Sequence, residues 1–196
     1  MNKNLEMLRC FFKVMRNKEG ELIKVIPNMY FNSFYDINEE ILLKNGINKL
    51  IIDIDGTILP VDSINVPTVL INKINSLKNH GIDMCLVSNN NINRVLPVCE
   101  KLGIDKYLAK ANKPLLECFK KAMCMLDVKD RKCVAMIGDQ MLSDIKGANE
   151  YGIYSILVRP IDNHQNLQTA TCRTLQNIME SHLKRIKRFD KNVYYK

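Results

Sequence analysis

The sequence predicts an α/β protein built on a doubly wound, Rossmann-like parallel sheet, and three observations support this fold class. Short apolar runs alternate with segments of helical periodicity between about residues 50 and 158, as in parallel sheets with helices on both faces. The run Leu50–Ile54 is apolar apart from Asp53, as in a strand buried on both faces. Polar residues follow several of these runs, where such sheets bind their ligands.

Composition limits the protein to a single soluble globular domain. The chain has 196 residues, of which 46% are hydrophobic and 26% charged, enough for one full-sized core. Its apolar runs are too short to span a bilayer, and the first residues lack a signal-peptide pattern. We therefore expect a cytoplasmic protein, with peripheral membrane contact left open. The seven cysteines show no zinc spacing and the three histidines are scattered, which argues against a Cys- or His-based metal site.

The net charge of +8 is concentrated at the two ends of the chain. Residues 1–24 hold six basic and three acidic side chains, residues 173–196 hold seven and two, and the remainder is neutral. Basic ends suit an anionic surface, such as lipid headgroups or nucleic acid. The plainer reading is that they are solvated faces of terminal helices.

The first 46 residues predict helices around an aromatic loop. Apolar residues at helical spacing predict an amphipathic helix that ends before Gly20 and packs on the core or lies on a membrane. These residues are Leu5, Leu8, Phe11, Phe12 and Met15. Residues 25–35 are aromatic-rich and are expected to pack as a loop. Asn38 is expected to cap a short helix that closes at Asn45-Gly46.

From residue 50 onwards strands and helices alternate. Strands are predicted at 50–54, 84–87, 107–109, 133–137 and 153–158. Helices are predicted at about 67–79, up to 102, from Pro114 and at 141–150. Pro97 predicts a break in the second of these helices, because proline lacks a backbone donor. Residues 159–171 are expected to be a linker before a basic amphipathic helix over 173–189. We therefore divide the chain into one globular domain, residues 1–172, and a basic C-terminal helical segment, residues 173–196.

Polar residues that can bind a cation or a phosphate lie at the ends of the predicted strands or at the start of a helix. They are Asp53, Asp55, Gly56 and Thr57 after the first strand, Ser88 and Asn89 after the second, Lys113 before a helix, and Asp139 with Asp144 after Gly138. Side chains alternate along a strand, so Asp53 and Asp55 are expected on the same side. Each group alone is explained by a turn, a helix cap or a solvated helix start. Together, in this order, they predict a site for a cation and a phosphate at the carboxyl edge of the sheet.

In this order the motifs resemble those of the haloacid dehalogenase (HAD) superfamily of phosphohydrolases over about residues 25–160. Within it the sequence is similar to subclass IIIA and the YqeG-type family, which is related to mitochondrial phosphatidylglycerophosphate phosphatases. The stretches that carry this likeness are Ile26-Pro-Asn-Met-Tyr30, Leu86-Val-Ser-Asn-Asn90, Gly138-Asp-Gln-Met-Leu-Ser-Asp144 and Ile156-Leu-Val-Arg-Pro-Ile161. Gly56 departs from the asparagine that many YqeG-type members have at this position.

The resemblance implies a Mg²⁺-dependent phosphatase with an aspartyl-phosphate intermediate. A phosphate monoester repels nucleophiles, so the site must supply positive charge. Asp53 would be the nucleophile and Asp55 the general acid and base. Asp53, Asp139 and the backbone carbonyl of Asp55 would bind Mg²⁺, which prefers oxygen ligands.

The remaining motif residues would bind and neutralise the phosphoryl group. Gly56, Thr57, Ser88, Asn89 and neighbouring amides would contact its oxygens. Lys113 would offset their charge, and Asp144 would orient Lys113.

The spacing of the motifs implies an open site. Residues 58–66 leave room only for a flap, and one helix and one strand fit between Ser88 and Lys113. An open site suits a large substrate, and phosphatidylglycerophosphate at an anionic membrane is the most specific candidate. The alternatives are a nucleotide, another soluble phosphomonoester, or a non-catalytic RNA- or ribosome-bound adaptor. No RNA-binding motif is present, and the sequence does not define the oligomeric state.

Overall fold

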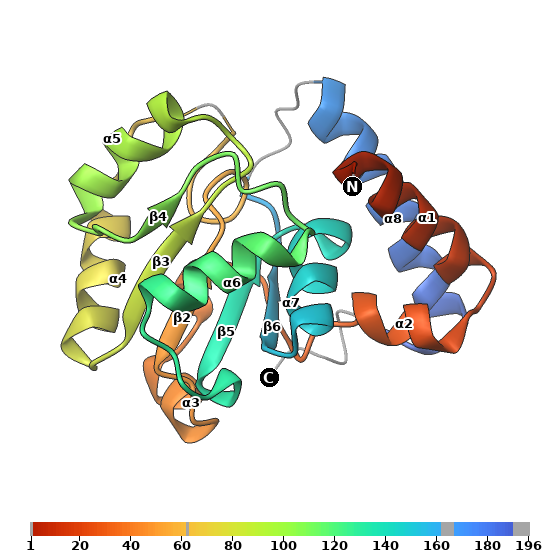
Figure 1. Cartoon of the computed structure of the whole chain (residues 1–196), viewed down its shortest axis with the longest axis horizontal. Coiled ribbons are helices and arrows are strands. Elements are labelled where there is room, and N and C mark those ends of the chain that lie inside the picture. The colour runs from red at the N-terminus through yellow and green to blue at the C-terminus, as the bar shows by residue number, and fades with distance from the viewer. Residues whose placement is uncertain (1, 62, 162–166, 190–196) are drawn as a thin grey trace.

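The computed structural model describes residues 2–61, 63–161 and 167–189, and for 167–172 the backbone alone. Within these ranges one parallel sheet of six strands runs through the molecule (Figure 1) in the order β1-β6-β5-β2-β3-β4. The strands are β1 (Met29–Phe31), β2 (Lys49–Ile52), β3 (Asp83–Val87), β4 (Tyr107–Leu108), β5 (Val134–Gly138) and β6 (Tyr154–Val158). The predicted doubly wound fold is confirmed.

Strand β2 lies at the point where the strand order reverses. Ile51 in β2 pairs with Cys85 in β3 on one side and with Met136 in β5 on the other. In doubly wound sheets the crevice outside the carboxyl ends of the strands at such a switch point is the ligand site. The predicted motifs follow β2, its neighbour β3 and its neighbour β5, so the topology brings them together.

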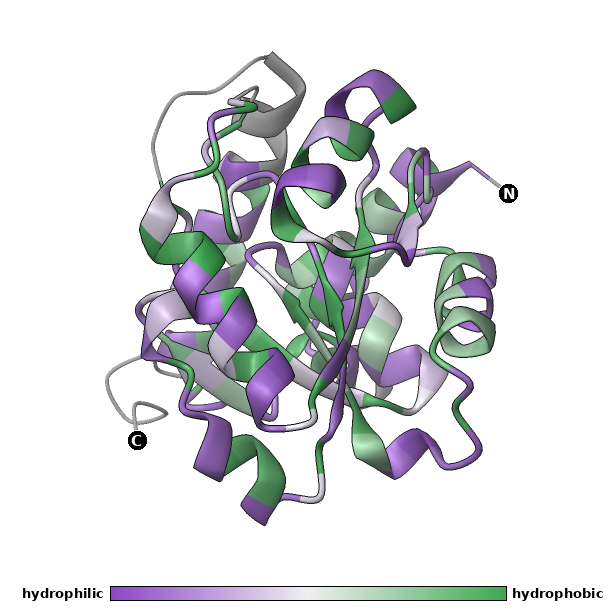
Figure 2. Ribbon diagram, turned by 90° about the vertical axis from the view of Figure 1, so that its left-hand side faces the viewer, coloured by the Kyte–Doolittle hydropathy of each residue, from purple (hydrophilic) through white to green (hydrophobic). Residues whose placement is uncertain are grey.

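Helices cover both faces of the sheet, and Figure 2 shows the green strands enclosed between them. The helices are α1 (Lys3–Met15), α2 (Glu19–Val25), α3 (Glu39–Lys44), α4 (Thr68–Asn79), α5 (Ile92–Leu102), α6 (Leu116–Met125), α7 (Lys146–Tyr151) and α8 (Leu167–Arg185). Helices α3, α4 and α5 pack on one face through residues such as Leu42, Ile74 and Val98. Helices α6 and α7 pack on the other through Phe119, Ala122 and Ala148.

Helices α1, α2 and α8 form a separate layer beyond the β1–β6 edge of the sheet (Figure 1). The buried face of α1 consists of Met7, Cys10, Phe11 and Val14. Its second apolar stripe is left in solvent, with Leu5, Leu8 and Phe12 exposed by 46%, 41% and 56%. The amphipathic helix is confirmed, but most of the residues that predicted it do not pack on the core.

Three local expectations are wrong. Residues 25–35 are not simply a loop, because Met29–Phe31 pairs with β6 as the edge strand of the sheet. Helix α5 continues through Pro97, since its apolar face is buried against the sheet and this packing outweighs the cost of about 3 kcal/mol for an interior proline. The expected linker 159–171 ends early, because α8 already begins at Leu167.

The segment after β5 also differs from expectation. A regular helix is predicted over 141–150, but Met141–Ile145 forms a π-helical turn before α7 begins at Lys146. Such turns are often found at functional sites. Elsewhere, Asn38 caps α3 by accepting a hydrogen bond from the Glu40 amide, as predicted. Among the helices within the described ranges, none has the length and apolar character needed to cross a bilayer.

Candidate active site

Asp53 lies just beyond the end of β2 and is only 5% exposed. Its amide still donates to the Ile137 carbonyl of β5 at 2.9 Å, so the backbone remains part of the sheet when it reaches the site. One carboxylate oxygen, Oδ1, accepts from Lys113 Nζ at 2.5 Å, and the other accepts from Thr57 Oγ1 at 3.2 Å. Because a carboxylate is costly to bury, these partners account for its place in the core.

Lys113 joins two of the predicted carboxylates. Its Nζ lies 2.5 Å from Asp53 Oδ1 and 2.7 Å from Asp144 Oδ1, and its side chain is 2% exposed. Burial alone would lower the pKa of Lys113, but Asp144 and then Asp53 raise it above its ordinary value. The lysine is therefore held as a cation at the position where a phosphoryl group would need positive charge.

Asn89 fixes the backbone around Lys113. Its Oδ1 accepts from the Lys113 amide at 2.7 Å, and its Nδ2 donates to the Lys113 carbonyl at 3.3 Å. This pair of bonds ties the segment after β3 to the segment before α6. In this structure the Asn89 side chain acts on Lys113, and through it on the site.

Three carboxylates, those of Asp53, Asp139 and Asp144, converge at the carboxyl edge of the sheet. Each offers one oxygen, and these oxygens lie within 4.8 Å of one another. Burial, opposed by Lys113, raises the pKa of Asp53 to about 7. Burial, followed by the negative charges of Asp53 and Asp144, raises the pKa of Asp139 well above its usual range. A buried cluster with this excess of negative charge and oxygen donors fits a hard divalent cation.

Asp55 lies in a different set of contacts from Asp53. Its Oδ2 accepts from Ser88 Oγ and from Asn90 Nδ2, both at 3.1 Å. Its Oδ1 accepts from Arg94, with Nε at 3.0 Å and the terminal NH2 at 2.8 Å. The Asp55 carboxylate is thus satisfied outside the three-carboxylate cluster.

Two glycines allow the acidic residues to approach the backbone. Gly56 has a φ of +83°, and a Cβ there would lie 2.7 Å from Asp139 Oδ2. A Cβ at Gly138 would lie 2.3 Å from the Asp144 carboxylate. The Asp144 Oδ2 also accepts from the Gln140 amide at 3.1 Å, which directs this side chain back toward the site. A larger residue at Gly56 or Gly138 would displace one of the carboxylates.

Helix α8 reaches the site, whereas the sequence predicted a basic amphipathic helix and left open whether it packs on the core. Gln176 donates from Nε2 to the Asp139 carbonyl and accepts from the Met141 amide, both at 3.0 Å. Arg173 NH2 lies 3.8 Å from Asp139 Oδ2. Arg94, in the first turn of α5, is a third residue that the sequence pattern did not identify. The helical period identified the buried face of α5, but no local signal linked an arginine there to Asp55.

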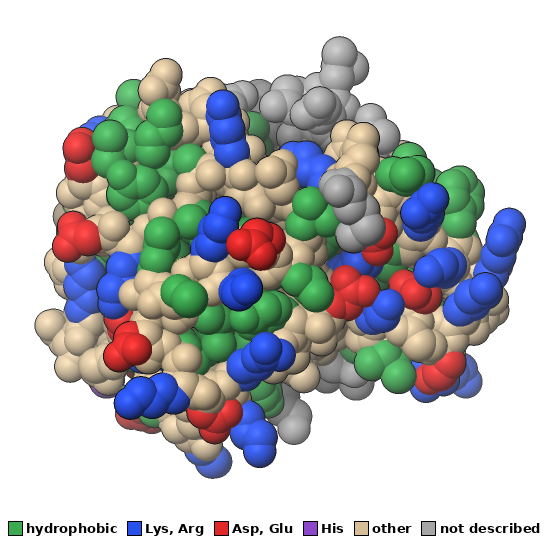
Figure 3. All heavy atoms as spheres, in the orientation of Figure 1, with side chains coloured by type: hydrophobic (Ala, Val, Ile, Leu, Met, Phe, Trp, Pro, Cys, Tyr) green, Lys and Arg blue, Asp and Glu red, His purple; other side chains and the backbone are tan. Residues whose placement is uncertain are grey.

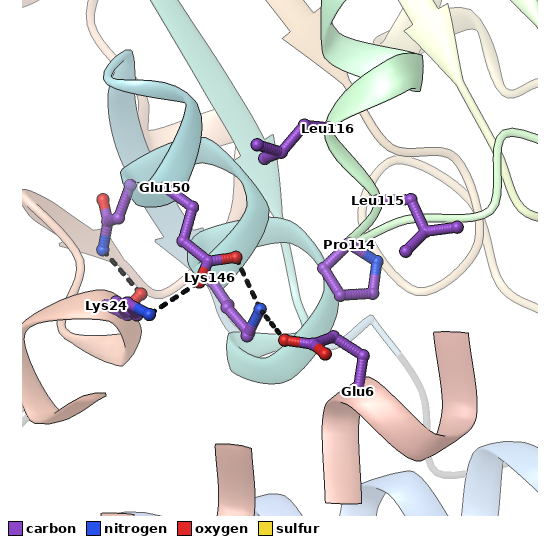
Figure 4. A pocket seen from close by; sticks show the side chains of 8 residues that line it. Glu6, Lys24, Pro114, Leu115, Leu116, Lys146 and Glu150 are labelled. Carbon is purple, nitrogen blue, oxygen red and sulfur yellow. Dashed lines mark hydrogen bonds and ion pairs between the residues drawn. The ribbon is translucent and has the colours of Figure 1, made fainter. Parts of the chain in front are cut away.

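A second cavity, of about 500 Å³, lies away from these carboxylates between α1, α2, the start of α6 and α7. Figure 4 shows the charged residues that line it paired with one another. Lys146 Nζ lies 3.1 Å from Glu6 and 2.5 Å from Glu150, and Lys24 lies 2.9 Å from Glu150. These ion pairs connect α1 and α2 to α7, and the charged side chains that line the cavity pair with one another.

The comparisons with known proteins identify the family of the chain. Residues 50–115 match the model of the haloacid dehalogenase-like hydrolases, and residues 109–172 match the HAD-hydrolase-like model. The chain belongs to the haloacid dehalogenase-like hydrolases. It is 34% identical over 160 residues to the probable phosphatase YqeG of Bacillus subtilis (strain 168), with 82% of this chain and 92% of the relative covered. It is therefore a member of the YqeG-type phosphatase family.

A solved structure shows the same fold. An uncharacterized protein from Listeria monocytogenes serotype 4b matches with a TM-score of 0.50 and 20% identity, over 61% of this chain and 85% of that one. The fold class and the family resemblance drawn from the motifs are both confirmed.

Proposed function

We propose that this chain hydrolyses a phosphomonoester through an aspartyl-phosphate intermediate on Asp53. The observation that supports this most strongly is the arrangement around Lys113, whose ammonium group lies between Asp53 and Asp144 beside the carboxylate of Asp139. A nucleophilic carboxylate, a buried cation and a set of metal-binding oxygens within a few ångströms are what phosphoryl transfer requires.

In the first step an Asp53 oxygen attacks phosphorus, and the bond from phosphorus to the leaving oxygen breaks. Asp55 gives its proton to that oxygen and so releases the alcohol. In the second step Asp55 takes a proton from water, which attacks the aspartyl phosphate and restores Asp53 with release of inorganic phosphate. Ser88 Oγ donates to Asp55 Oδ2 in this structure, so its hydroxyl would have to turn to hold a phosphoryl oxygen.

Mg²⁺ is the proposed cofactor, held by Asp53, Asp139 and the backbone carbonyl of Asp55. When bound, it would supply positive charge that offsets the repulsion between the Asp53 carboxylate and the phosphoryl oxygens. Burial, and then the neighbouring carboxylates, raise the pKa values of Asp53 and Asp139, and a bound cation would stabilise their charged forms.

The substrate class is proposed from the shape of the site and from α1. Only α5 and β4 lie between Ser88 and Lys113, so no cap domain is inserted there. The exposed stripe of Leu5, Leu8 and Phe12 carries Arg9 and Arg16 beside it, and Figure 3 shows green and blue side chains together over α1. Apolar and basic groups on one helix face suit an anionic bilayer. We propose an anionic phospholipid monoester such as phosphatidylglycerophosphate.

The catalytic proposal is tested with p-nitrophenyl phosphate, with and without Mg²⁺. Wild type should turn over only with the metal, and Asp53→Asn should be inactive but folded. Asp105→Asn, which changes an exposed aspartate after α5, is the matched control and should behave as wild type. Metal-dependent turnover by Asp53→Asn would refute the assignment of the nucleophile.

The membrane proposal has its own test. Wild type should co-sediment with vesicles that contain phosphatidylglycerol but not with neutral phosphatidylcholine vesicles. Leu8→Ser with Phe12→Ser should lose this binding while retaining activity on p-nitrophenyl phosphate. Val69→Ser, at a similarly exposed apolar residue on α4, is the control. If wild type ignores anionic vesicles, the lipid substrate is rejected and a soluble phosphomonoester, such as a nucleotide, takes its place.

A further inference from the structure

Arg94 is a buried arginine directed at the predicted general acid. It lies in the first turn of α5, is 7% exposed, and donates from both Nε and NH2 to Asp55 Oδ1. The same NH2 lies 3.5 Å from the Pro60 carbonyl, in the loop that follows the first motif. Arg94 therefore joins Asp55 to the loop that follows the first motif.

The four contacts to Asp55 leave its carboxylate little freedom. Ser88 and Asn90 bind Oδ2 from one side, while Arg94 binds Oδ1 from the other. The planar guanidinium holds Oδ1 through two nitrogens in a fixed geometry, which the single ammonium of a lysine does not provide. Because Ser88 and Asn90 hold the other oxygen, both ends of the carboxylate are restrained. General acid catalysis depends on such restraint, because the donor must lie within hydrogen-bond reach of the leaving oxygen.

Arg94 is also held at a cost that packing alone does not explain. Its NH1 is buried and has no hydrogen-bond partner among the described residues. A buried donor without a partner destabilises a fold by about 1–3 kcal/mol. An apolar residue would bury the same surface of α5 without this cost, which points to a role at Asp55.

We propose that Arg94 is a positioning residue that holds Asp55 in the orientation needed to protonate the leaving oxygen. This inference rests on the proposed phosphatase function and deepens it. Arg94 acts through Asp55 and takes no part in bond making. Removing Arg94 should therefore lower the rate more for an ester whose leaving group needs a proton than for one whose leaving group does not.

The experiment compares two esters that differ in this need. p-Nitrophenolate leaves readily without a proton, whereas the alkoxide of glycerol phosphate does not. The readout is kcat/KM, which covers the steps up to the departure of the leaving group and so excludes the later hydrolysis of the aspartyl phosphate. The variants are Arg94→Gln and Arg94→Lys, with Asp55→Asn as the reference for complete loss of the acid.

We expect Arg94→Gln to lower kcat/KM for glycerol phosphate by about 10²-fold, and for p-nitrophenyl phosphate by less than about fivefold, by analogy with the loss of a general acid. Arg94→Lys keeps the charge and should recover part of the loss. The matched control is Lys101→Gln. Lys101 also lies on α5 and donates to a carbonyl of the same loop, that of Ile64 at 3.3 Å. Within the described part of the chain, Asp55 forms its side-chain contacts with Ser88, Asn90 and Arg94 and not with Lys101. The Lys101→Gln variant should have the wild-type kcat/KM for both esters.

Equal losses on the two esters would overturn the inference, because a structural role has no reason to distinguish leaving groups. A large loss in Lys101→Gln that matches Arg94→Gln would also overturn it, in favour of loop tethering. If thermal unfolding shows that Arg94→Gln does not fold, Arg94→Lys tests the inference through the same comparison of kcat/KM losses on the two esters. Failure of wild type on both esters would instead reject the proposed function on which the inference depends.

Discussion

The buried lysine of the site offers the clearest test of its energetics. Lys113→Met removes the ammonium between Asp53 and Asp144, whose side chains are only 8% and 1% exposed. Neither carboxylate can turn to solvent, so the variant must either keep buried negative charge without its partner or bind a proton, and both cost free energy. Breaking a buried ion pair in this way costs about 3–5 kcal/mol.

Lys146→Met is the matched control for this variant. Lys146 is also buried between two carboxylates, but its partners Glu6 and Glu150 are 25% and 20% exposed and can regain water. We expect this change to cost about 1–2 kcal/mol. The control therefore separates the burial of the partners from the burial of the lysine itself.

Urea unfolding at pH 8 without metal measures both variants. With a slope of about 2 kcal/mol per molar, a loss of 3 kcal/mol lowers the midpoint by roughly 1.5 M. We expect the Lys113→Met midpoint to fall at least twice as far as that of Lys146→Met. Equal shifts, or a larger shift for Lys146→Met, would refute the argument that the acidic cluster depends on Lys113.

Three further predictions concern the metal and its surroundings. Gly56→Ala should lower the free energy of unfolding by about 1–2 kcal/mol, because φ is +83° at this position. It should also weaken Mg²⁺ binding in calorimetry, because the new Cβ would lie 2.7 Å from Asp139 Oδ2. An unchanged affinity would contradict this reasoning. The affinity for Mg²⁺ should fall by up to about tenfold for each pH unit below 7. Asp53 must lose its proton to bind a cation, and its pKa is raised to about 7. An affinity that does not change between pH 6 and 8 would contradict the assignment of Asp53 as a ligand. Gln176→Leu should lower the stability measured by thermal unfolding by about 1–3 kcal/mol, because the Met141 amide and the Asp139 carbonyl lose their hydrogen-bond partner. An unchanged stability would mean that water replaces the side chain.

Much of the site was predictable because its main residues follow strands. The strand pattern located β3, β5 and β6 to within one residue at each end and β2 to within two, and parallel topology then required their carboxyl ends to meet. Asp53, Lys113 and Asp144 are in contact as predicted, and Asp139 lies beside them. These motif positions needed only local pattern and the rule that ligands bind at this edge.

The sequence by itself determined the doubly wound sheet, the order of the motifs and the family, because local periodicity and strand-end chemistry encode all three. Only the tertiary structure placed Arg94 on Asp55, 39 residues away, and Gln176 of α8 on the Asp139 carbonyl. It also decided that α1 buries Met7 and Phe11 and leaves Leu8 exposed. The physical reason is that a periodic pattern shows which faces of a helix are apolar, but not what covers them, since that depends on contacts between segments far apart in the chain.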